Sequence, residues 1–293
     1  MALLSGVGIL VAGTAGADSR WTPYHDSFSG PKVKAHYVHL VLSIDPEREA
    51  AIRRDIKDTY AACRRGKESL LAAGEDPGPL APPPREGVPD RSKIRDVDVY
   101  YSDGQSATIV TESNFRINLK EDGEGSSDER ARRADCSLKE HKSKRLYVGR
   151  ADALCEVDLL SGRYYSKGCP WTERTRADAS RMKLPAGGPA PGASFAAQAT
   201  GEKRRIAGHE CTVFDVLNGT FERCFASPAS SFAIPASHYA GRQSGLLLQN
   251  KWPMVGETLT ATDIKLEIDV SKAIFDPPPG ALLDSPQRGR RRK

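Results

Sequence analysis

The chain has 293 residues, of which 39% are hydrophobic and 28% charged, enough to bury the core of one large β domain or two small ones. The formal net charge of +5 arises at the C-terminus, because Arg288, Arg290, Arg291, Arg292 and Lys293 are five of the 43 basic residues and the 38 others match 38 acidic residues. A neutral body argues against a nucleic-acid surface spread over the fold, so we expect no specific nucleic-acid partner.

Residues 1–17 have the features of a secretory signal peptide. They carry no charged side chain, contain a short apolar core, and end in Ala15-Gly16-Ala17, the small-x-small pattern of a cleavage site. About ten apolar residues are too few to cross a bilayer, and no later segment approaches the ~20 needed for a transmembrane helix. We therefore expect a periplasmic or secreted protein that is not transmembrane, with residues 18–280 forming its folded part.

The first elements of the folded part are a strand and a helix. Val33 to Ile44 alternates and is rich in aromatic and β-branched residues, which predicts a strand. Asp45-Pro46-Glu47 is a helix start, with the Asp45 side chain as the expected cap. An apolar stripe at helical spacing follows, and Gly66 is expected to interrupt the helix. The stripe consists of Ile52, Ile56, Tyr60 and Cys63.

The middle of the chain predicts short strands separated by irregular segments. Residues 75–92 are Pro-rich and are expected to form a surface insertion. Alternating residues predict strands over 97–101, 107–111 and 115–119, with Asp103-Gly104 as a tight turn. Asp96 and Asp98 occupy the opposite positions of the first of these strands and are assigned to its solvent face. A charged loop and a short strand near Leu146 to Val148 follow.

Two similar segments suggest cysteine-flanked hairpins. One runs from Cys155 to Cys169 around Ser161-Gly162, and the other from Cys211 to Cys224 around Asn218-Gly219. A two-residue turn leaves each pair slightly out of direct register, which a bulge or a longer turn can correct. Six cysteines allow 15 pairings, and an even number in an exported chain favours disulfides. We predict three pairs, namely Cys155–Cys169, Cys211–Cys224 and Cys63–Cys136.

Structural zinc is the competing use of these cysteines. No Cys-x-x-Cys occurs, and His209-x-Cys211 is the one close cysteine–histidine pair, so the four-ligand clusters typical of zinc are missing. His36 and His39 also resemble a metal pair, but an odd spacing on a strand sends the two rings to opposite faces. We expect no metal and no cofactor.

The last third of the folded part contains a linker and closing strands. Residues 185–201 are rich in Gly, Pro and Ala, and either divide two domains or loop out of one sheet. Further strands are predicted over Leu246 to Leu248, Thr258 to Ile264 and Leu266 to Val270. Residues 281–293 are expected to be a disordered basic tail, either solvated or docked on an anionic envelope surface through its five terminal basic side chains. The fold class is mainly β with some helix (α+β).

Residues 201–280 resemble an uncharacterised bacterial family, the domain of unknown function 4412 group. The resemblance rests on Ile206 to Phe214, Cys224-Phe225-Ala226, Thr260 to Ile264 and Phe275-Asp276-Pro277-Pro278. That family is in turn similar to periplasmic lipoprotein carrier and sensor domains (LolA/RseB-like). The resemblance implies a curved antiparallel sheet, a half-barrel, with one or two covering helices around an apolar cavity. In that arrangement the stripe of Ile52, Ile56 and Tyr60 is a lid over the concave face.

These patterns contain no recognisable catalytic motif, so we do not expect an enzyme. The resemblance favours an exported envelope protein that binds an apolar ligand or lipid on the concave face of the sheet. The alternative is a structural or protein-interaction module, in which the sheet edges, the Pro-rich insertion and the tail contact partners. An uncharacterised enzyme is the third hypothesis, and a deep pocket lined by paired acidic or histidine side chains would favour it.

Overall fold

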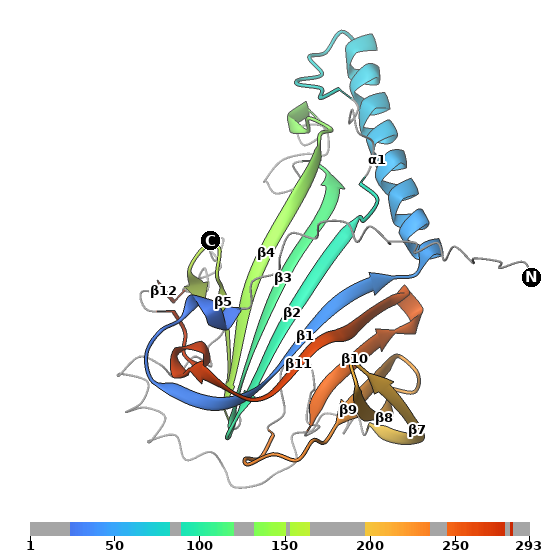
Figure 1. The fold of residues 1–293 in the computed structure, drawn as a ribbon. Helices are drawn as coiled ribbons and strands as arrows, with labels where there is room; N and C mark the ends of the chain where they lie inside the picture. Colours follow the sequence, from blue (N-terminus) through green and yellow to red (C-terminus); the bar gives the residue numbers. More distant parts are fainter. Residues whose placement is uncertain are drawn as a thin grey trace, which may run out of the picture.

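The computed structural model of the chain describes residues 24–82, 89–119, 132–150, 153–164, 197–234, 245–278 and 282–283. The predicted signal peptide, Cys169, most of the predicted linker and the terminal basic residues lie outside these ranges. Within them the protein is mainly β, with one long helix (Figure 1). The coarse prediction of fold class is therefore confirmed.

The strands form one curved, open sheet. Its order is β12-β6-β5-β4-β3-β2-β1-β11-β10-β9-β8-β7, antiparallel except for the two-residue pair β6 and β12. The strand bounds are β1 (Lys32–Ile44), β2 (Lys93–Ser102), β3 (Gln105–Ile117), β4 (Leu138–Arg150), β5 (Ala153–Asp158), β6 (Arg163–Tyr164), β7 (Gln198–Ile206), β8 (His209–Val216), β9 (Phe221–Ala226), β10 (Leu246–Trp252), β11 (Glu257–Ser271) and β12 (Leu282–Leu283). Strands from before and after the predicted linker belong to one and the same sheet.

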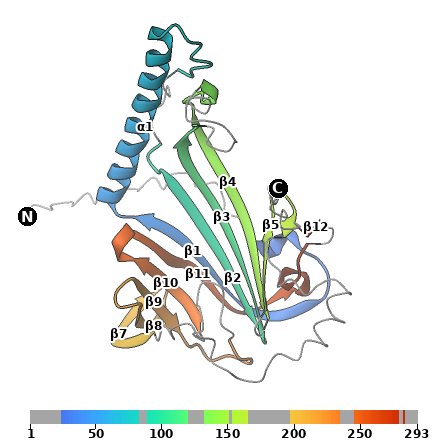
Figure 2. The same cartoon turned by 180° about the vertical axis from the view of Figure 1, so that it is seen from behind.

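Helix α1 (Pro46–Ala72) stands at one end of this sheet, beside the ends of β2, β3 and β4 (Figures 1 and 2). It begins at the predicted proline, but Asp45 makes no side-chain capping bond. It also runs through Gly66, where the prediction of a break is wrong. The ammonium of Lys67 is buried there and donates to the carbonyl oxygens of Pro77 and, at 2.9 Å, Arg132. Tertiary contacts of this kind outweigh the ~1 kcal/mol that glycine costs inside a helix.

One face of the sheet is the inner side of its curve. This inner face carries Val38 of β1 and Val99 and Tyr101 of β2, which are fully buried. The hydroxyl of Tyr101 accepts a hydrogen bond from the Leu247 amide of β10, although β1 and β11 separate the two strands. The sheet therefore folds over this face. Leu40, Val97, Phe225, Leu247 and Leu259 belong to the same core.

The opposite, outer face is covered by two short 3-10 helices. These are η1 (Tyr24–Ser27), before β1, and η3 (Lys272–Phe275), after β11. The third, η2 (Pro253–Val255), joins β10 to β11. The outer-face core contains Tyr37, Tyr100, Ile109, Leu146, Val148, Val157, Ile274 and Phe275, with Tyr24 and Phe28 packed against it. Both faces of the central strands are therefore buried, and the assignment of Asp98 to solvent is wrong because its exposed fraction is 1%.

Several strands are longer than predicted. The segments 107–111 and 115–119 join into β3, and the short strand at Leu146 to Val148 is the end of β4. Residues 198–201 of the linker open β7, and Leu282–Leu283 of the tail form β12. Cross-strand hydrogen bonds satisfy the backbone of polar residues as well as apolar ones, so the strands extend where the alternation stops.

The predicted register is correct for one of the two cysteine-flanked hairpins and wrong for the other. Val216 pairs with Phe221 around Asn218-Gly219, which gives the predicted register of the second hairpin. In the first hairpin, Asp158 pairs with Arg163, so the loop is centred on Leu160 and Ser161, one residue before the predicted turn. Gly162 adopts a left-handed conformation at the end of that loop, with φ of 68°. Glycine takes this conformation without steric cost.

Candidate functional site

The disulfide between Cys63 and Cys136 fastens α1 to the sheet. The two Cα atoms are 5.9 Å apart, and the bridge joins residues 73 apart in sequence. Around it lies a third, small core in which Ile56 of α1 packs with Ile117 of β3. Ile52, Tyr60, Phe115 and Leu119 pack against its edge. The predicted stripe of the helix therefore contacts the outer face at the end of β3, rather than the concave face that the resemblance implies.

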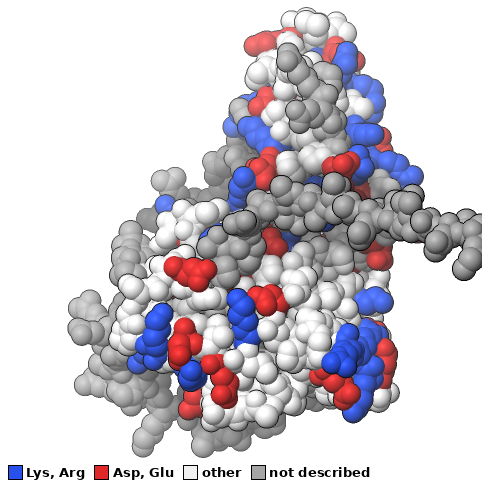
Figure 3. Space-filling view, viewed as in Figure 1, with Lys and Arg blue, Asp and Glu red and all other residues white. Residues whose placement is uncertain are grey.

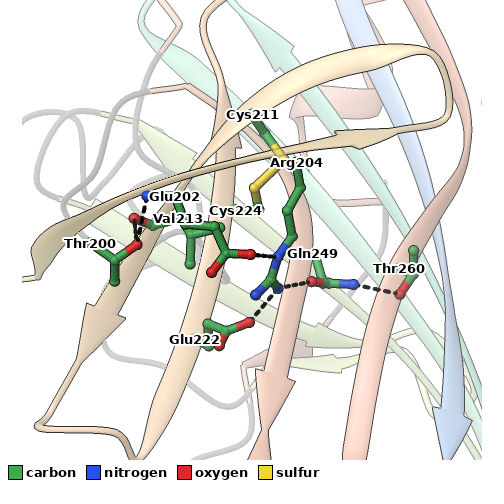
Figure 4. Close-up of a disulfide and its surroundings, with 9 residues drawn as sticks. All are labelled: Thr200, Glu202, Arg204, Cys211, Val213, Glu222, Cys224, Gln249 and Thr260. Atoms are coloured by element: carbon green, nitrogen blue, oxygen red, sulfur yellow. Dashed lines mark hydrogen bonds and ion pairs between the residues drawn. A yellow bond between two sulfur atoms is a disulfide. The ribbon is translucent and has the colours of Figure 1, made fainter.

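A second disulfide joins Cys211 of β8 to Cys224 of β9, with their Cα atoms 5.4 Å apart (Figure 4). Beside it, the Arg204 guanidinium donates to Glu202, Glu222 and, at 2.8 Å, to the Gln249 side chain. Hydrogen bonds to the two carboxylates raise the pKa of Arg204 above its usual value. The groups around this bridge are thus engaged with one another, and they connect β7, β9 and β10 rather than forming a vacant site.

Both of these bridges are pairs predicted from the sequence. Cys155 is also disulfide-bonded, and no described cysteine is a free thiol. Its predicted partner Cys169 lies outside the described residues, so the pair Cys155–Cys169 stays a prediction.

A cleft of about 320 Å³ lies between α1 and the end of β3. Its lining combines apolar and polar side chains. Ile52, Ile56, Phe115, Ile117 and Leu119 supply the apolar part, and Asp55, Thr59, Arg116, Asn118 and His141 the polar part. This volume and this mixture are those of a small-molecule site, in which a few polar groups orient a mostly apolar ligand.

The cleft opens at this place because β2 begins only at Lys93, opposite Asn114 of β3. Beyond that point, among the described residues, the β3 backbone is bonded on the β2 side through one hydrogen bond, from the Phe115 amide to the Ser92 carbonyl. Helix α1 stands over this end, held by its disulfide. The free stretch of β3 is therefore the floor of the cleft.

A second hollow, of about 400 Å³, lies on the inner face over β2, β3 and β4. It is a polar groove, lined by Arg95, Val110, Glu112, Asn114, Arg116, His141, Lys142, Ser143, Arg145 and Tyr147. Arg95 and Glu112 form an ion pair at 2.6 Å. Burial raises the pKa of Glu112, but the charge and hydrogen bond of Arg95 lower it further, so the pKa is below its usual value. Glu112 is therefore already neutralised by a partner.

The cleft and the groove share two lining residues, Arg116 and His141. Arg116 is exposed, and no carboxylate of the described residues lies within ion-pair distance of its guanidinium. The other two groove arginines are paired, Arg95 with Glu112 and Arg145 with Glu156 at 3.3 Å. Within the described part of the chain, Arg116 is thus a cation without a carboxylate partner where the apolar cleft meets the polar groove.

A buried polar cluster on the outer face is the nearest approach to catalytic chemistry. Asp98 accepts hydrogen bonds from the Tyr37 hydroxyl at 2.8 Å and pairs with the His39 ring at 3.1 Å. The other nitrogen of His39 faces Asp96 at 3.8 Å. Burial raises the pKa of Asp96; the charge of His39 opposes that shift and the charge of Asp98 adds to it.

This cluster lines neither of the two hollows. Asp98 is 1% exposed and His39 is 7% exposed, so a substrate reaches neither without displacing covering residues. The arrangement joins β1 to β2 through side chains, which is a structural role. His36, three residues earlier, lies on the inner face against Ser230 and Phe232. The two histidines are thus separated by the sheet, as their spacing predicts.

Within the described part of the chain, no three His, Cys, Asp or Glu side chains are placed to hold a metal ion. In the same part, no helix combines the length and apolar character that a membrane span requires. On the face shown in Figure 3, acidic and basic side chains are intermixed over the described residues.

Sequence reasoning placed Ile52 and Ile56 at the site but missed Arg116, His141 and Asp55. Phe115, Ile117 and Leu119 were recognised as one side of a strand, without any indication of what covers that side. Arg116 falls between them in the alternation, which assigns it to the opposite face. Because β2 starts late, the cleft is lined by residues of β3 from both faces of the sheet. No pattern in the sequence predicts where β2 starts.

Comparison with known proteins identifies no relatives by sequence. No family model matches the chain, and no curated protein matches it. Among solved structures, the chain aligns with PNGF-II with a TM-score of 0.32 and 9% identity. That alignment covers 86% of this chain and 30% of the other, so the chain spans less than a third of the protein it matches. A likeness this weak carries no argument about fold or function.

Proposed function

We propose that this is an exported, non-enzymatic protein of the cell envelope that binds an apolar ligand or lipid in the cleft between α1 and β3. The observation that carries the proposal is the cleft itself, about 320 Å³ with five aliphatic or aromatic side chains facing one another. Apolar surface of this kind, left in contact with water, is stabilised when a ligand covers it.

The location of the site differs from the one the family resemblance implies. The inner face is filled by its own side chains where it is apolar, and its hollow over β2, β3 and β4 is polar. The cleft of this proposal lies instead on the outer side, under the helix. The helix still acts as a cover, because its stripe supplies Ile52 and Ile56 to the lining.

Two features support the compartment and the absence of catalysis. Disulfides such as Cys63–Cys136 persist in oxidising compartments, which fits export to the periplasm or beyond. The titratable cluster of His39 and Asp98 is buried away from the cleft. Binding without chemistry is the simplest use of a cleft that this cluster does not line.

Blocking the cleft tests the proposal. Thr59 lines the cleft from α1 and is half-buried, so Thr59→Trp places an indole in the ligand volume. Lys57→Trp adds the same side chain at an exposed position of α1 that does not line the cleft. The probe is the neutral fluorophore N-phenyl-1-naphthylamine, whose emission rises in an apolar site.

We expect the native protein and Lys57→Trp to bind the probe with similar affinity, and Thr59→Trp to bind at least about tenfold more weakly. Equal affinity in the two variants would place the probe elsewhere and overturn the proposal. Native mass spectrometry of protein purified from its own host gives an independent result. A mass equal to the bare polypeptide after mild extraction would count against a tightly held lipid.

A further inference from the structure

We infer that the ligand of the cleft is an anionic amphiphile, with its chain under α1 and its head group at Arg116 and His141, where the cleft meets the polar groove. This inference rests on the proposed function and adds the chemical class of the ligand. Its basis is that two hollows of opposite character share Arg116 and His141. A molecule apolar at one end and charged at the other matches both hollows at once.

The apolar end of the site is formed by α1 and β3. Ile56 is 5% exposed and Ile117 is 6% exposed, and both belong to the small core around the Cys63–Cys136 disulfide. Ile52, Phe115 and Leu119 are half-buried and extend that core into the cleft. A hydrocarbon chain laid against them continues an existing apolar cluster, which is favourable in proportion to the area covered.

The polar end of the site carries a positive charge because its other basic side chains are paired with carboxylates. In the groove, Arg95 is neutralised by Glu112 and Arg145 by Glu156, while Lys142 pairs with Glu140 at 3.0 Å. Arg116 has no carboxylate partner among the described residues. Its guanidinium presents several donors in one plane, a geometry that suits a carboxylate or phosphate.

The carboxylate of Asp55 in α1 would repel an anionic ligand in the cleft. It is exposed and lines the cleft, but it does not line the groove. A head group placed in the groove therefore contacts Arg116, whereas Asp55 lines only the cleft. The residual repulsion predicts that removing the Asp55 charge strengthens the binding of an anion.

The test compares three probes with the same twelve-carbon chain, namely dodecanoate, dodecyl phosphate and dodecanol, by calorimetry on the full chain. We expect the native protein to bind at least one of the two anions about tenfold more tightly than the neutral alcohol, the size expected for a charged hydrogen-bonded contact. The better of the two anions identifies the head-group chemistry.

Variants then assign the preference to the site. Arg116→Gln should reduce the ratio of anion to alcohol affinity to about one, and Asp55→Asn should increase it. Arg54→Gln removes an exposed arginine of α1 that lines neither hollow, and should leave the ratio unchanged.

The outcomes separate this inference from the function on which it rests. If dodecanol binds, is blocked by Thr59→Trp, and equals both anions in affinity, the charge preference is wrong and the apolar cleft stands. The preference is also wrong if it survives Arg116→Gln. If none of the three probes binds, both proposals fall.

Discussion

The amide of Leu247 in β10 donates a hydrogen bond of 3.3 Å to the hydroxyl of Tyr101 in β2, across 146 residues of sequence. Two strands lie between these residues in the sheet, so the bond crosses the inside of its curve. At this point the inside of the curve is therefore occupied by the protein's own side chains. The proposed ligand site lies outside the curve, under α1.

The bond gives a stability prediction that is independent of ligand binding. Tyr101→Phe leaves the Leu247 amide without its acceptor and should lower the free energy of unfolding by about 1 kcal/mol. Tyr101→Ala removes a fully buried aromatic ring and should cost about 3–5 kcal/mol. Urea denaturation measures both, and the affinity of Tyr101→Phe for the apolar probe should equal that of the native protein. A loss of probe binding in Tyr101→Phe would mean that the ligand occupies the inner face.

The buried cluster on the outer face predicts a larger loss. Asp98→Ala removes the acceptor of the Tyr37 hydroxyl and the partner of the His39 ring, both in a region closed to water. Leaving buried donors without acceptors should lower the free energy of unfolding by about 3 kcal/mol. Asp269→Ala is the matched control, since Asp269 forms an exposed ion pair with Lys34 and should change stability by less than about 0.5 kcal/mol. Similar losses in both variants would contradict a structural role for the cluster.

His36 predicts a pH dependence of stability. Its Nδ1 accepts a hydrogen bond from the Glu267 amide at 3.1 Å, so that nitrogen carries no proton and the ring is neutral. Its Nε2 then donates to the Ser230 hydroxyl at 2.8 Å. The Glu267 amide is free to reach the ring because β11 bulges here, with Glu267 at a φ of 51°. Protonation of Nδ1 would break this contact.

Burial lowers the pKa of His36 below its ordinary 6.5, and the charge of Glu267 opposes that shift only in part. The unfolded chain therefore binds a proton at higher pH than the folded protein does. The stability that neutral His36 contributes is present above pH 6.5 and is lost as the pH falls below it. The free energy of unfolding should decrease from pH 7.5 to pH 5.

The measurement is urea denaturation at these two values for the native protein and for His36→Gln. The variant should show a smaller decrease, but not none, because burial lowers the pKa of His25 in the same direction. An identical decrease in the two proteins would show that His36 does not titrate as its contacts require.

The central strands and the first helix could be predicted because their residues alternate or repeat at a clear period. The alternation of Val97, Val99 and Tyr101 gave the correct inner face of β2. It gave the wrong environment for Asp98, because what covers the outer face comes from residues 24–28 and 272–275, far away in sequence. Alternation indicates that two faces differ, but not whether the second one meets water.

The same limit applies to the candidate site. Cys63 and Cys136 were paired from the hairpin argument for the other four cysteines, and that pairing fixes where α1 meets the sheet. The cleft depends in addition on β3 extending past the start of β2. Strand ends are set by backbone hydrogen bonds that polar residues such as Asn114 make as readily as apolar ones, so the composition of the segment does not reveal them.

The two described disulfides should differ in what their loss does. The Cys63–Cys136 bridge joins residues 73 apart and the Cys211–Cys224 bridge residues 13 apart, so loop-closure entropy predicts costs of about 4 and about 3 kcal/mol. Only the first holds the cover of the cleft. The double variant Cys63→Ser, Cys136→Ser should therefore bind the probe about tenfold more weakly. The measurement is made without denaturant, at a temperature where the variant stays folded. Cys211→Ser with Cys224→Ser, at a similar loss of stability, should leave the affinity unchanged, since β8 and β9 contribute no residue to the cleft. Circular dichroism confirms folding of both variants before the comparison.

If the two pairs of substitutions weaken binding equally, the cleft depends on the whole fold rather than on the position of α1, and the role of the helix as a cover is wrong.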